Sequence, residues 1–231
     1  MKNIILIILV LLSSCGFSQR QNNWRDGHVE LDSIPLTAYE YKERGKRKSA
    51  NGDKQGAIDD YTRAIMVEPT YDTAYHNRGV VRADIGYYKD AILDYTKAIE
   101  INPHFAASYF SRANAKVDLR DNKGALSDYS KAIELNPRFI DPYVNRGVLK
   151  SEMGDYEGEI ADYHLAIKHC EPSVNLYNNL GRALYDLERF KESAEATAKV
   201  LSISRRTTDC IMAVVWHVNA WATVRELVRI G

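Results

Sequence analysis

Apolar residues recur at helical spacing through most of this sequence, in short runs that turns separate. Each pair of runs is split by a turn such as Asn51-Gly52-Asp53 or Gly154-Asp155, and an Asn-Pro or Glu-Pro step follows most of the second runs. Glycine and proline at such points end helices. The pattern therefore predicts pairs of α-helices, each pair folded into a hairpin.

The hairpin pattern repeats with a fixed period of 34 residues. Two columns show the period: Tyr75, Tyr109, Tyr143 and Tyr177, and Pro69, Pro103 and Pro137. The units are counted from Ala38, Asp72, Ala106, Ile140 and Val174. Residues 38–207 thus form five units, and an array of this kind grows by stacking rather than by enlarging one core.

Three columns hold mostly small residues, which let two helix backbones approach closely. The eighth position has Gly45, Gly79, Ala113, Gly147 and Gly181, the twentieth has Ala57, Ala91, Ala125, Glu159 and Ser193, and the twenty-seventh has Ala64, Ala98, Ala132, Ala166 and Val200. The twenty-fourth position has Tyr61, Tyr95, Tyr129 and Tyr163, then Thr197. We expect these tyrosines to fill the space that the small residues leave.

This pattern, with its terminal proline, resembles the tetratricopeptide repeat over residues 38–207. The sequence departs from the repeat at Glu159, at Pro172, which comes one place late, and at Thr197 with Val200. The resemblance implies an all-α fold, a right-handed superhelical solenoid of antiparallel helix hairpins.

Two columns of opposite charge run through the first four units. The seventh position has Arg44, Arg78, Arg112 and Arg146, and the twenty-third has Asp60, Asp94, Asp128 and Asp162. Both charges are lost together in the fifth unit, at Leu180 and Ala196. Pairing between units would leave one charge without a partner at each end, whereas pairing within units leaves none. We therefore predict an Arg–Asp ion pair joining the two helices of each of the first four units.

Charge balance and motif content argue against several functions. Lys plus Arg and Asp plus Glu both total 31 residues, so no basic excess favours a nucleic acid or an anionic membrane surface. The sequence has no GxSxG, HExxH, CxxC or phosphate-binding glycine motif. The spacing of His164, His169 and Cys170 does not put them on one helix face. We expect no catalysis, no metal site and no cofactor.

The resemblance also implies a concave groove, lined by the first helix of each unit. The positions that would face it hold Lys42, Lys46, His76, Asn77, Val80, Phe110, Asn114, Val144, Asn145, Val148, Asn178, Asn179 and Arg182. Amides, apolar side chains and positive charge at both ends suit an extended or helical peptide of another protein. The valines suit packing between units equally well, and the two lysines suit simple solvation.

Some members of this family grip a terminal carboxylate with a clamp of lysines, asparagines and an arginine. Lys42 and Asn77 match two of the clamp positions, but Lys46, Ala107 and Ser111 depart from the other three. We therefore do not expect a clamp for a chaperone tail.

Residues 1–18 resemble a secretory signal, with Lys2 ahead of the apolar run 4–12, which is too short to span a membrane. Its end has two interpretations. The sequence LSSC resembles a bacterial lipobox, in which Cys15 would be lipidated, or an ordinary peptidase would cleave after Ser18. We favour the lipoprotein, because a cysteine at this place is otherwise unnecessary. Residues 19–37 are polar and irregular, and we interpret them as a tether between membrane and array.

Residues 208–231 follow the fifth unit without a repeat signature. Their apolar residues recur on one helix face, at Ile211, Val214, Val218, Trp221 and Val228. We predict a C-terminal capping helix, because the end of an array exposes an apolar side that must be covered. Trp216 lies off this stripe and is a candidate second contact site.

The sequence thus predicts an exported, lipid-anchored scaffold of the cell envelope that binds another protein in its groove. The alternative is a structural assembly subunit that self-associates through its C-terminal apolar helix.

Overall fold

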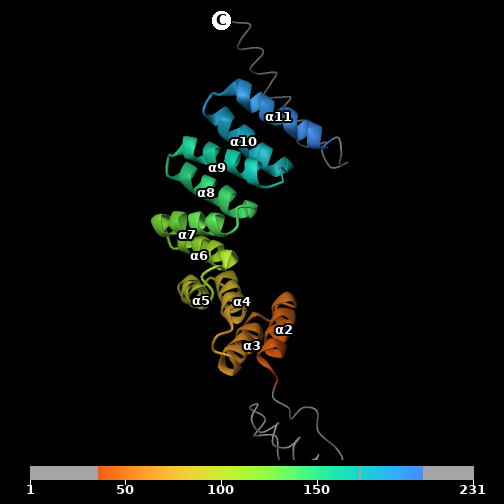
Figure 1. The fold of residues 1–231 in the computed structure, drawn as a ribbon, viewed down its shortest axis with the longest axis vertical. Helices are drawn as coiled ribbons and strands as arrows, with labels where there is room; N and C mark the ends of the chain where they lie inside the picture. Colours follow the sequence, from red (N-terminus) through yellow and green to blue (C-terminus); the bar gives the residue numbers. More distant parts are fainter. Residues whose placement is uncertain (1–35, 172, 205–231) are drawn as a thin grey trace, which may run out of the picture. The chain divides into compact units, whose positions relative to one another are not determined.

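The computed structural model describes residues 36–171 and 173–204, and these residues are helical along most of their length (Figure 1). The predicted signal at 1–18 with Cys15 and the predicted capping helix at 208–231 with Trp216 lie outside the described residues. So does nearly all of the predicted tether at 19–37. These three predictions stay predictions.

Ten α-helices make up the part of the chain that the structure describes. They are α2 (Ala38–Ala50), α3 (Lys54–Val67), α4 (Asp72–Asp84), α5 (Tyr88–Ile101), α6 (Ala106–Asp118), α7 (Asn122–Leu135), α8 (Ile140–Glu152), α9 (Tyr156–His169), α10 (Val174–Asp186) and α11 (Phe190–Ser204). The even-numbered helices begin at the residues from which the units were counted, so each unit is one even-numbered and one odd-numbered helix.

Each helix packs on the next helix in chain order, so the hairpins stack one after another (Figure 1). Among the first helices, α4 also contacts α2 of the preceding unit and α6 of the following unit. The predicted all-α solenoid of antiparallel hairpins is therefore confirmed. None of the helices in residues 36–171 and 173–204 has the length and hydropathy to cross a bilayer.

The turn inside each hairpin needs one residue with a positive φ angle. The fifteenth position supplies it, with φ between 59° and 87° at Gly52, Gly86, Arg120, Gly154 and Glu188. Glycine takes this left-handed conformation without a steric penalty, whereas a side chain makes it unfavourable. The conformation recurs even where glycine is absent, which shows that the hairpin geometry requires it.

An aspartate begins the second helix in three of the five units. The carboxylates of Asp53, Asp121 and Asp155 accept a hydrogen bond from the backbone N–H of the glycine three residues later, at 2.9 to 3.0 Å. This contact satisfies one of the free donors at a helix start. It fixes where the chain leaves the turn.

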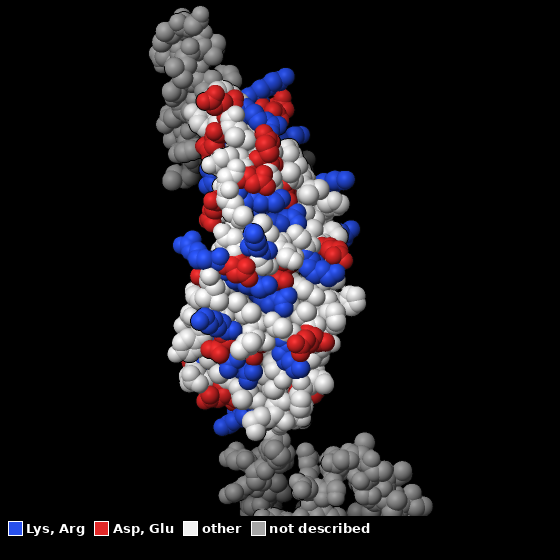
Figure 2. All heavy atoms as spheres, turned by 90° about the vertical axis from the view of Figure 1, so that its left-hand side faces the viewer, with Lys and Arg blue, Asp and Glu red and all other residues white. Residues whose placement is uncertain are grey.

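Buried alanines form the contact surface between the helices. Ala57, Ala64, Ala91, Ala98, Ala125, Ala132 and Ala166 are all fully buried. On the face shown in Figure 2, positive and negative side chains are interspersed along the described array. Neither sign of charge dominates this face, just as neither dominates the composition of the chain.

Candidate functional site

In units one, two and four, the two helices approach closely where a glycine of the first helix lies beneath a tyrosine ring of the second. A Cβ atom added to Gly79 would lie 2.8 Å from Cε1 of Tyr95, and one added to Gly45 would lie 3.0 Å from Cε1 of Tyr61. Such distances are well below van der Waals contact. The expectation that the tyrosine column fills the space beside the small column is confirmed, and this contact holds the first helix in place against the second.

The predicted ion pairs are present in each of the first four units. In each, the arginine Nε and Nη2 donate to the two carboxylate oxygens of the aspartate sixteen residues later, at 2.6 to 3.0 Å. The aspartates Asp60, Asp94, Asp128 and Asp162 are at most 5% exposed. Burial alone would raise the pKa of Asp60, but hydrogen bonds from Arg44 and Lys48 outweigh it and hold that pKa below its usual value.

A second cation joins each pair, from the eleventh position of the unit. Lys48, Arg82, Lys116 and Lys150 contact the buried aspartates of their own units at 2.7 to 3.0 Å. Sequence reasoning missed this column because it mixes lysine with arginine and follows the first cation by only one helical turn. Each buried carboxylate therefore has two cationic partners on one face of the first helix.

The arginines also connect neighbouring units. Nη1 of Arg78 donates to Thr62 Oγ1 of the preceding unit at 3.0 Å, and Arg112 and Arg146 repeat this contact with Thr96 and Ser130. The pairing thus holds the two helices of a unit together and orients each unit on the one before it.

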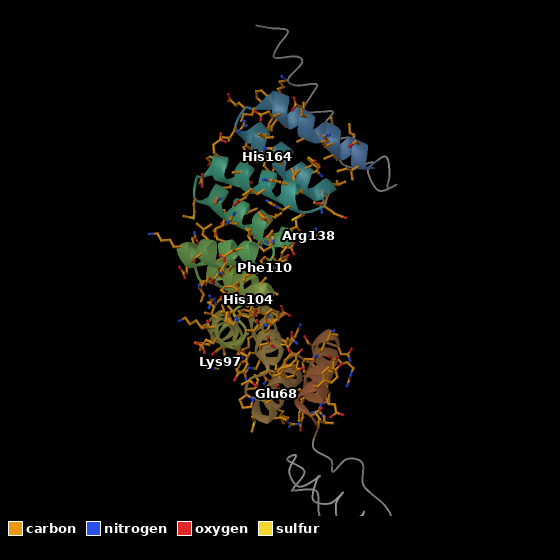
Figure 3. The ribbon with its side chains drawn as sticks, in the orientation of Figure 1. Glu68, Lys97, His104, Phe110, Arg138 and His164 are labelled. Atoms are coloured by element: carbon orange, nitrogen blue, oxygen red, sulfur yellow. The ribbon has the colours of Figure 1, made fainter. Side chains whose placement is uncertain are left out.

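In the fifth unit, buried apolar residues replace the network of ion pairs. The three charged positions become Leu180, Leu184 and Ala196, which are at most 5% exposed and belong to one buried cluster with Tyr163. Thr62, Thr96 and Ser130 accept a hydrogen bond from the arginine of the next unit, and His164 on α9 occupies their position in unit four (Figure 3). All parts of the network are therefore replaced together, as expected if they act as one unit.

One hollow among the described residues lies between the first helices of units one and two, α2 and α4. It encloses about 500 Å³, within the range of ligand sites. We call it the first hollow, and it is lined by Lys42, Glu43, Lys46, Ser49, Ala50, Lys54, Tyr61, Thr73, Asn77, Val80 and Val81. Three lysines and one glutamate give its lining a positive balance.

The second hollow lies between α6 and α8, the first helices of units three and four. It encloses about 270 Å³, room for a side chain, since one water occupies about 30 Å³ in the liquid. Its lining is Asn114, Val117, Asp118, Tyr129, Asn145, Val148, Leu149 and Glu152. Two carboxylates and no cation give this second hollow a negative balance.

The two hollows occupy equivalent places in the repeat. In each, the twenty-fourth residue of one unit, Tyr61 or Tyr129, lies below, and the sixth residue of the next unit, Asn77 or Asn145, lies beside it. In the second hollow the hydroxyl of Tyr129 donates to Asn114 Oδ1 at 2.6 Å. Nδ2 of Asn145 donates to the same oxygen at 3.0 Å, so the floor of this hollow is fixed by hydrogen bonds.

Seven of the predicted groove residues line these hollows. Lys42, Lys46, Asn77 and Val80 line the first, and Asn114, Asn145 and Val148 line the second. The residues that the sequence reasoning did not name include the acids Asp118 and Glu152, at the thirteenth position of their units. The repetition of a carboxylate at that position in successive units is the signal that could have found them.

The other predicted groove residues have different surroundings. Phe110 is half-buried on α6, with its ring centroid 5.0 Å from that of Phe139 and 6.0 Å from that of Tyr129 (Figure 3). Val144 packs against the apolar cluster of units four and five. Asn178 and Asn179 are half-buried, and Arg182 is exposed on α10. None of these five is among the residues that line the two hollows.

His76 lies between units two and three rather than along either hollow. Its Nδ1 is 2.9 Å from Ser108 Oγ, and its ring centroid is 4.8 Å from that of Phe105 and 5.7 Å from that of Tyr95. Burial lowers the pKa of His76 to about 4, despite the nearby charge of Asp72. The imidazole is therefore neutral at pH 7 and packs as part of the interface.

Within residues 36–171 and 173–204, no group of three or more His, Cys, Asp or Glu side chains is arranged to hold a metal ion. The described hollows offer shape, hydrogen-bonding groups and charge to a ligand.

Comparison with known proteins agrees with this architecture. A tetratricopeptide repeat family model matches residues 73–105, and a second model of the same repeat matches residues 106–139 and 174–207. No sequence among the curated proteins matches the chain.

Solved structures of the same fold are similar over most of their length. A crystal structure of MamA is 23% identical, with a TM-score of 0.64 over 75% of this chain and 95% of that one. YrrB, described as a TPR protein with an unusual peptide-binding site, is 20% identical, with a TM-score of 0.58 over 78% and 91%. The first TPR of Spaghetti (RPAP3), bound to an HSP90 peptide, is 23% identical, with a TM-score of 0.50 over 51% and 93%.

The repeat spacing, the stacked hairpins and the matching family models lead to one conclusion. Residues 73–139 and 174–207 are tetratricopeptide repeats, and the hairpins at 38–71 and 140–173 have the same pair of helices in the same stacked array.

Proposed function

We propose that this protein is a non-catalytic interaction scaffold that binds a segment of another protein along the first helices of its units. The observation that carries the proposal is the pair of equivalent hollows, one between α2 and α4 and one between α6 and α8. A peptide crossing several first helices would meet the two hollows in turn. Repeat arrays use extended surfaces of this kind for binding.

The lining of the hollows suits a peptide. Val80 and Val148 offer apolar contact, while Asn77 and Asn145 offer amides that can pair with a peptide backbone. Two of the similar structures, YrrB and the Spaghetti TPR, carry a peptide-binding site or a bound peptide according to their descriptions. This likeness supports a protein segment as the ligand class.

A terminal-carboxylate clamp is a poorer fit than binding along the segment. Lys42, Lys46 and Asn77 do come together in the first hollow. The third unit, however, contributes the uncharged Ala107 and Ser111 where such a clamp needs cations. The basic groups of the first hollow therefore suit an acidic side chain within a segment as well as they suit a chain end.

A selected peptide tests the groove directly. Peptides from a random library displayed on phage would be selected on the full chain, and their affinities measured for two variants, Val80→Trp and Val148→Trp, that fill the hollows. We expect at least one of these variants to weaken binding about tenfold or more, because a filled pocket removes the main anchor contacts. Leu93→Trp is the matched control, since Leu93 is 67% exposed on α5. Equal binding by all three variants would show that the peptides bind elsewhere.

The solution mass separates this function from self-assembly. Gel filtration with light scattering should give a monomer whose mass does not change with concentration. A mass that grows with concentration, and that deletion of residues 208–231 returns to that of a monomer, would favour the assembly subunit instead.

We further propose that the chain is exported and anchored by a lipid on Cys15. The support is the sequence alone, an apolar run at 4–12 followed by LSSC. Labelled palmitate should be incorporated by the parent chain and not by Cys15→Ser. Equal labelling of the two proteins, or none of either, would contradict the anchor.

A further inference from the structure

A column of carboxylates runs along the first helices at the thirteenth position of units two to five. The residues are Asp84, Asp118, Glu152 and Asp186, at the ends of α4, α6, α8 and α10. The charge of Asp84 is neutralised by another residue of the same chain. Lys54, at the start of α3 in the preceding unit, places Nζ 2.9 Å from Asp84 Oδ2. The repeat can therefore bring an ammonium group to a carboxylate of this column.

The next two carboxylates have no such partner. The position of Lys54 is occupied by Tyr88 in the second unit and by Asn122 in the third, and neither side chain carries a positive charge. Among residues 36–171 and 173–204, neither Asp118 nor Glu152 forms an ion pair. The same geometric position is thus charge-balanced at one interface and left negative at the following two.

Both unpaired carboxylates line the second hollow. Its floor is the phenol of Tyr129, and Val117 and Val148 add apolar surface. Burial raises the pKa of Tyr129 to about 12, and the charges of Asp118 and Glu152 act in the same direction. The phenol therefore stays neutral, and the negative charge belongs to the two carboxylates.

We propose that the second hollow receives a lysine or arginine side chain from the bound segment. The cation takes the role at Asp118 and Glu152 that Lys54 performs at Asp84, and its alkyl stem contacts Val117 and Val148. Lysine and arginine commonly bury their stems along apolar surface while the charged head stays near water. This inference rests on the proposed function, and it names the chemistry of the segment.

A side chain fits the hollow better than a metal ion. Only two carboxylates line it, whereas Ca²⁺ takes six to eight oxygen ligands and Mg²⁺ requires octahedral coordination. An ammonium or guanidinium group needs only one or two acceptors, and carboxylates hold it by charge-assisted hydrogen bonds. The opposite charge balance of the first hollow also keeps a basic side chain from binding there instead.

The test is a double-mutant cycle between peptide and protein. The peptide selection on the full chain should enrich lysine or arginine, and one selected peptide would be remade with norleucine, which is uncharged, at the enriched place. We expect norleucine to weaken binding about fivefold, the effect of an exposed to partly buried ion pair. Asp118→Asn with Glu152→Gln should weaken the lysine peptide by the same factor and leave the norleucine peptide unchanged.

Asp84→Asn is the matched control, because Asp84 has the same position in its unit and already pairs with Lys54. It should leave the ratio of the affinities of the lysine and norleucine peptides unchanged. Peptides that Val148→Trp blocks but that show no preference for lysine or arginine would overturn this inference and leave the proposed function standing. A preference that persists in Asp118→Asn with Glu152→Gln would overturn it as well. Peptides that none of the hollow-filling variants affects would overturn both.

Discussion

Gly79 lies so close beneath the ring of Tyr95 that a methyl group at this position would be 2.8 Å from Cε1. The ring is 2% exposed and cannot swing into solvent without opening the core between α4 and α5. We therefore expect Gly79→Ala to destabilise the array by about 1 to 3 kcal/mol, the usual cost of overpacking. Urea unfolding followed by circular dichroism measures the change.

Gly181 provides the control for this prediction. It has the same position in the fifth unit, but the tyrosine is replaced by Thr197, and a Cβ atom would lie 3.7 Å from its nearest neighbour, Ala196. Gly181→Ala should be neutral or should stabilise the helix by up to about 1 kcal/mol, because alanine is the better helix former. A loss of stability equal to that of Gly79→Ala would show that the ring contact is not the cause.

The cap at the start of α7 couples two residues. Asp121 accepts a hydrogen bond from the N–H of Gly124, and a Cβ atom on Gly124 would lie 2.2 Å from the Asp121 carboxylate. Asp121→Ala should cost about 1 kcal/mol through loss of the cap. Gly124→Ala should cost a similar amount, since the carboxylate must move away. In the double variant no clash remains. Its loss of unfolding free energy should therefore be well below the sum of the two single losses. Additive losses would contradict this coupling.

The neutral state of His76 makes stability depend on pH. The unfolded chain takes up a proton at this histidine below about pH 6.5, whereas the folded chain does so only below about pH 4. Protons therefore favour unfolding in this window, and the free energy of unfolding should fall by up to about 3 kcal/mol as the pH drops through it. Urea midpoints at the two ends of the window measure the slope.

Two variants show whether His76 is the cause. His76→Phe should flatten the pH dependence in this window whatever it does to stability at pH 7. His104→Gln should leave the pH dependence intact, since His104 is exposed in the loop before α6 (Figure 3). If His76→Phe keeps the slope of the parent, other groups control acid sensitivity.

The helix pairs, the ion pairs and the tyrosine contacts were predictable because each recurs at one spacing. A column such as Arg78 and Arg112 with Asp94 and Asp128 repeats the same geometry, so the repeat itself shows which residues meet. The cations Lys48 and Arg82 also recur, but they lie one helical turn from the arginines, on a face that charged residues occupy in any exposed helix.

The ring contacts of the fifth position were missed although they repeat. His76 in unit two contacts Phe105 and Tyr95, and Phe110 in unit three contacts Phe139 and Tyr129, at the same two positions of the repeat. The sequence analysis assigned both side chains to the groove because the family pattern places them on its face. The unpaired state of Asp118 was harder to predict, because it depends on the absence of a lysine in another unit.

The fifth unit shows how the array can dispense with its ion pairs. Leu180 and Leu184 occupy the places of the two cations, and Ala196 occupies the place of the aspartate, all of them buried. A buried ion pair is often no more stable than well-packed apolar residues, whereas a buried charge that loses its partner is costly. The same replacement should therefore be tolerated in another unit if it is made as a whole.

We expect this exchange to work in the third unit, where Arg112 and Lys116 hold Asp128 at 2.7 to 2.8 Å. Asp128→Ala alone should destabilise the array by about 3 kcal/mol, because it leaves two cations without their carboxylate. Arg112→Leu and Lys116→Leu added to it should recover most of that loss in urea unfolding. A triple variant less stable than the single one would mean that the hydrogen bond from Arg112 to Thr96 of the preceding unit contributes more than the ion pair itself.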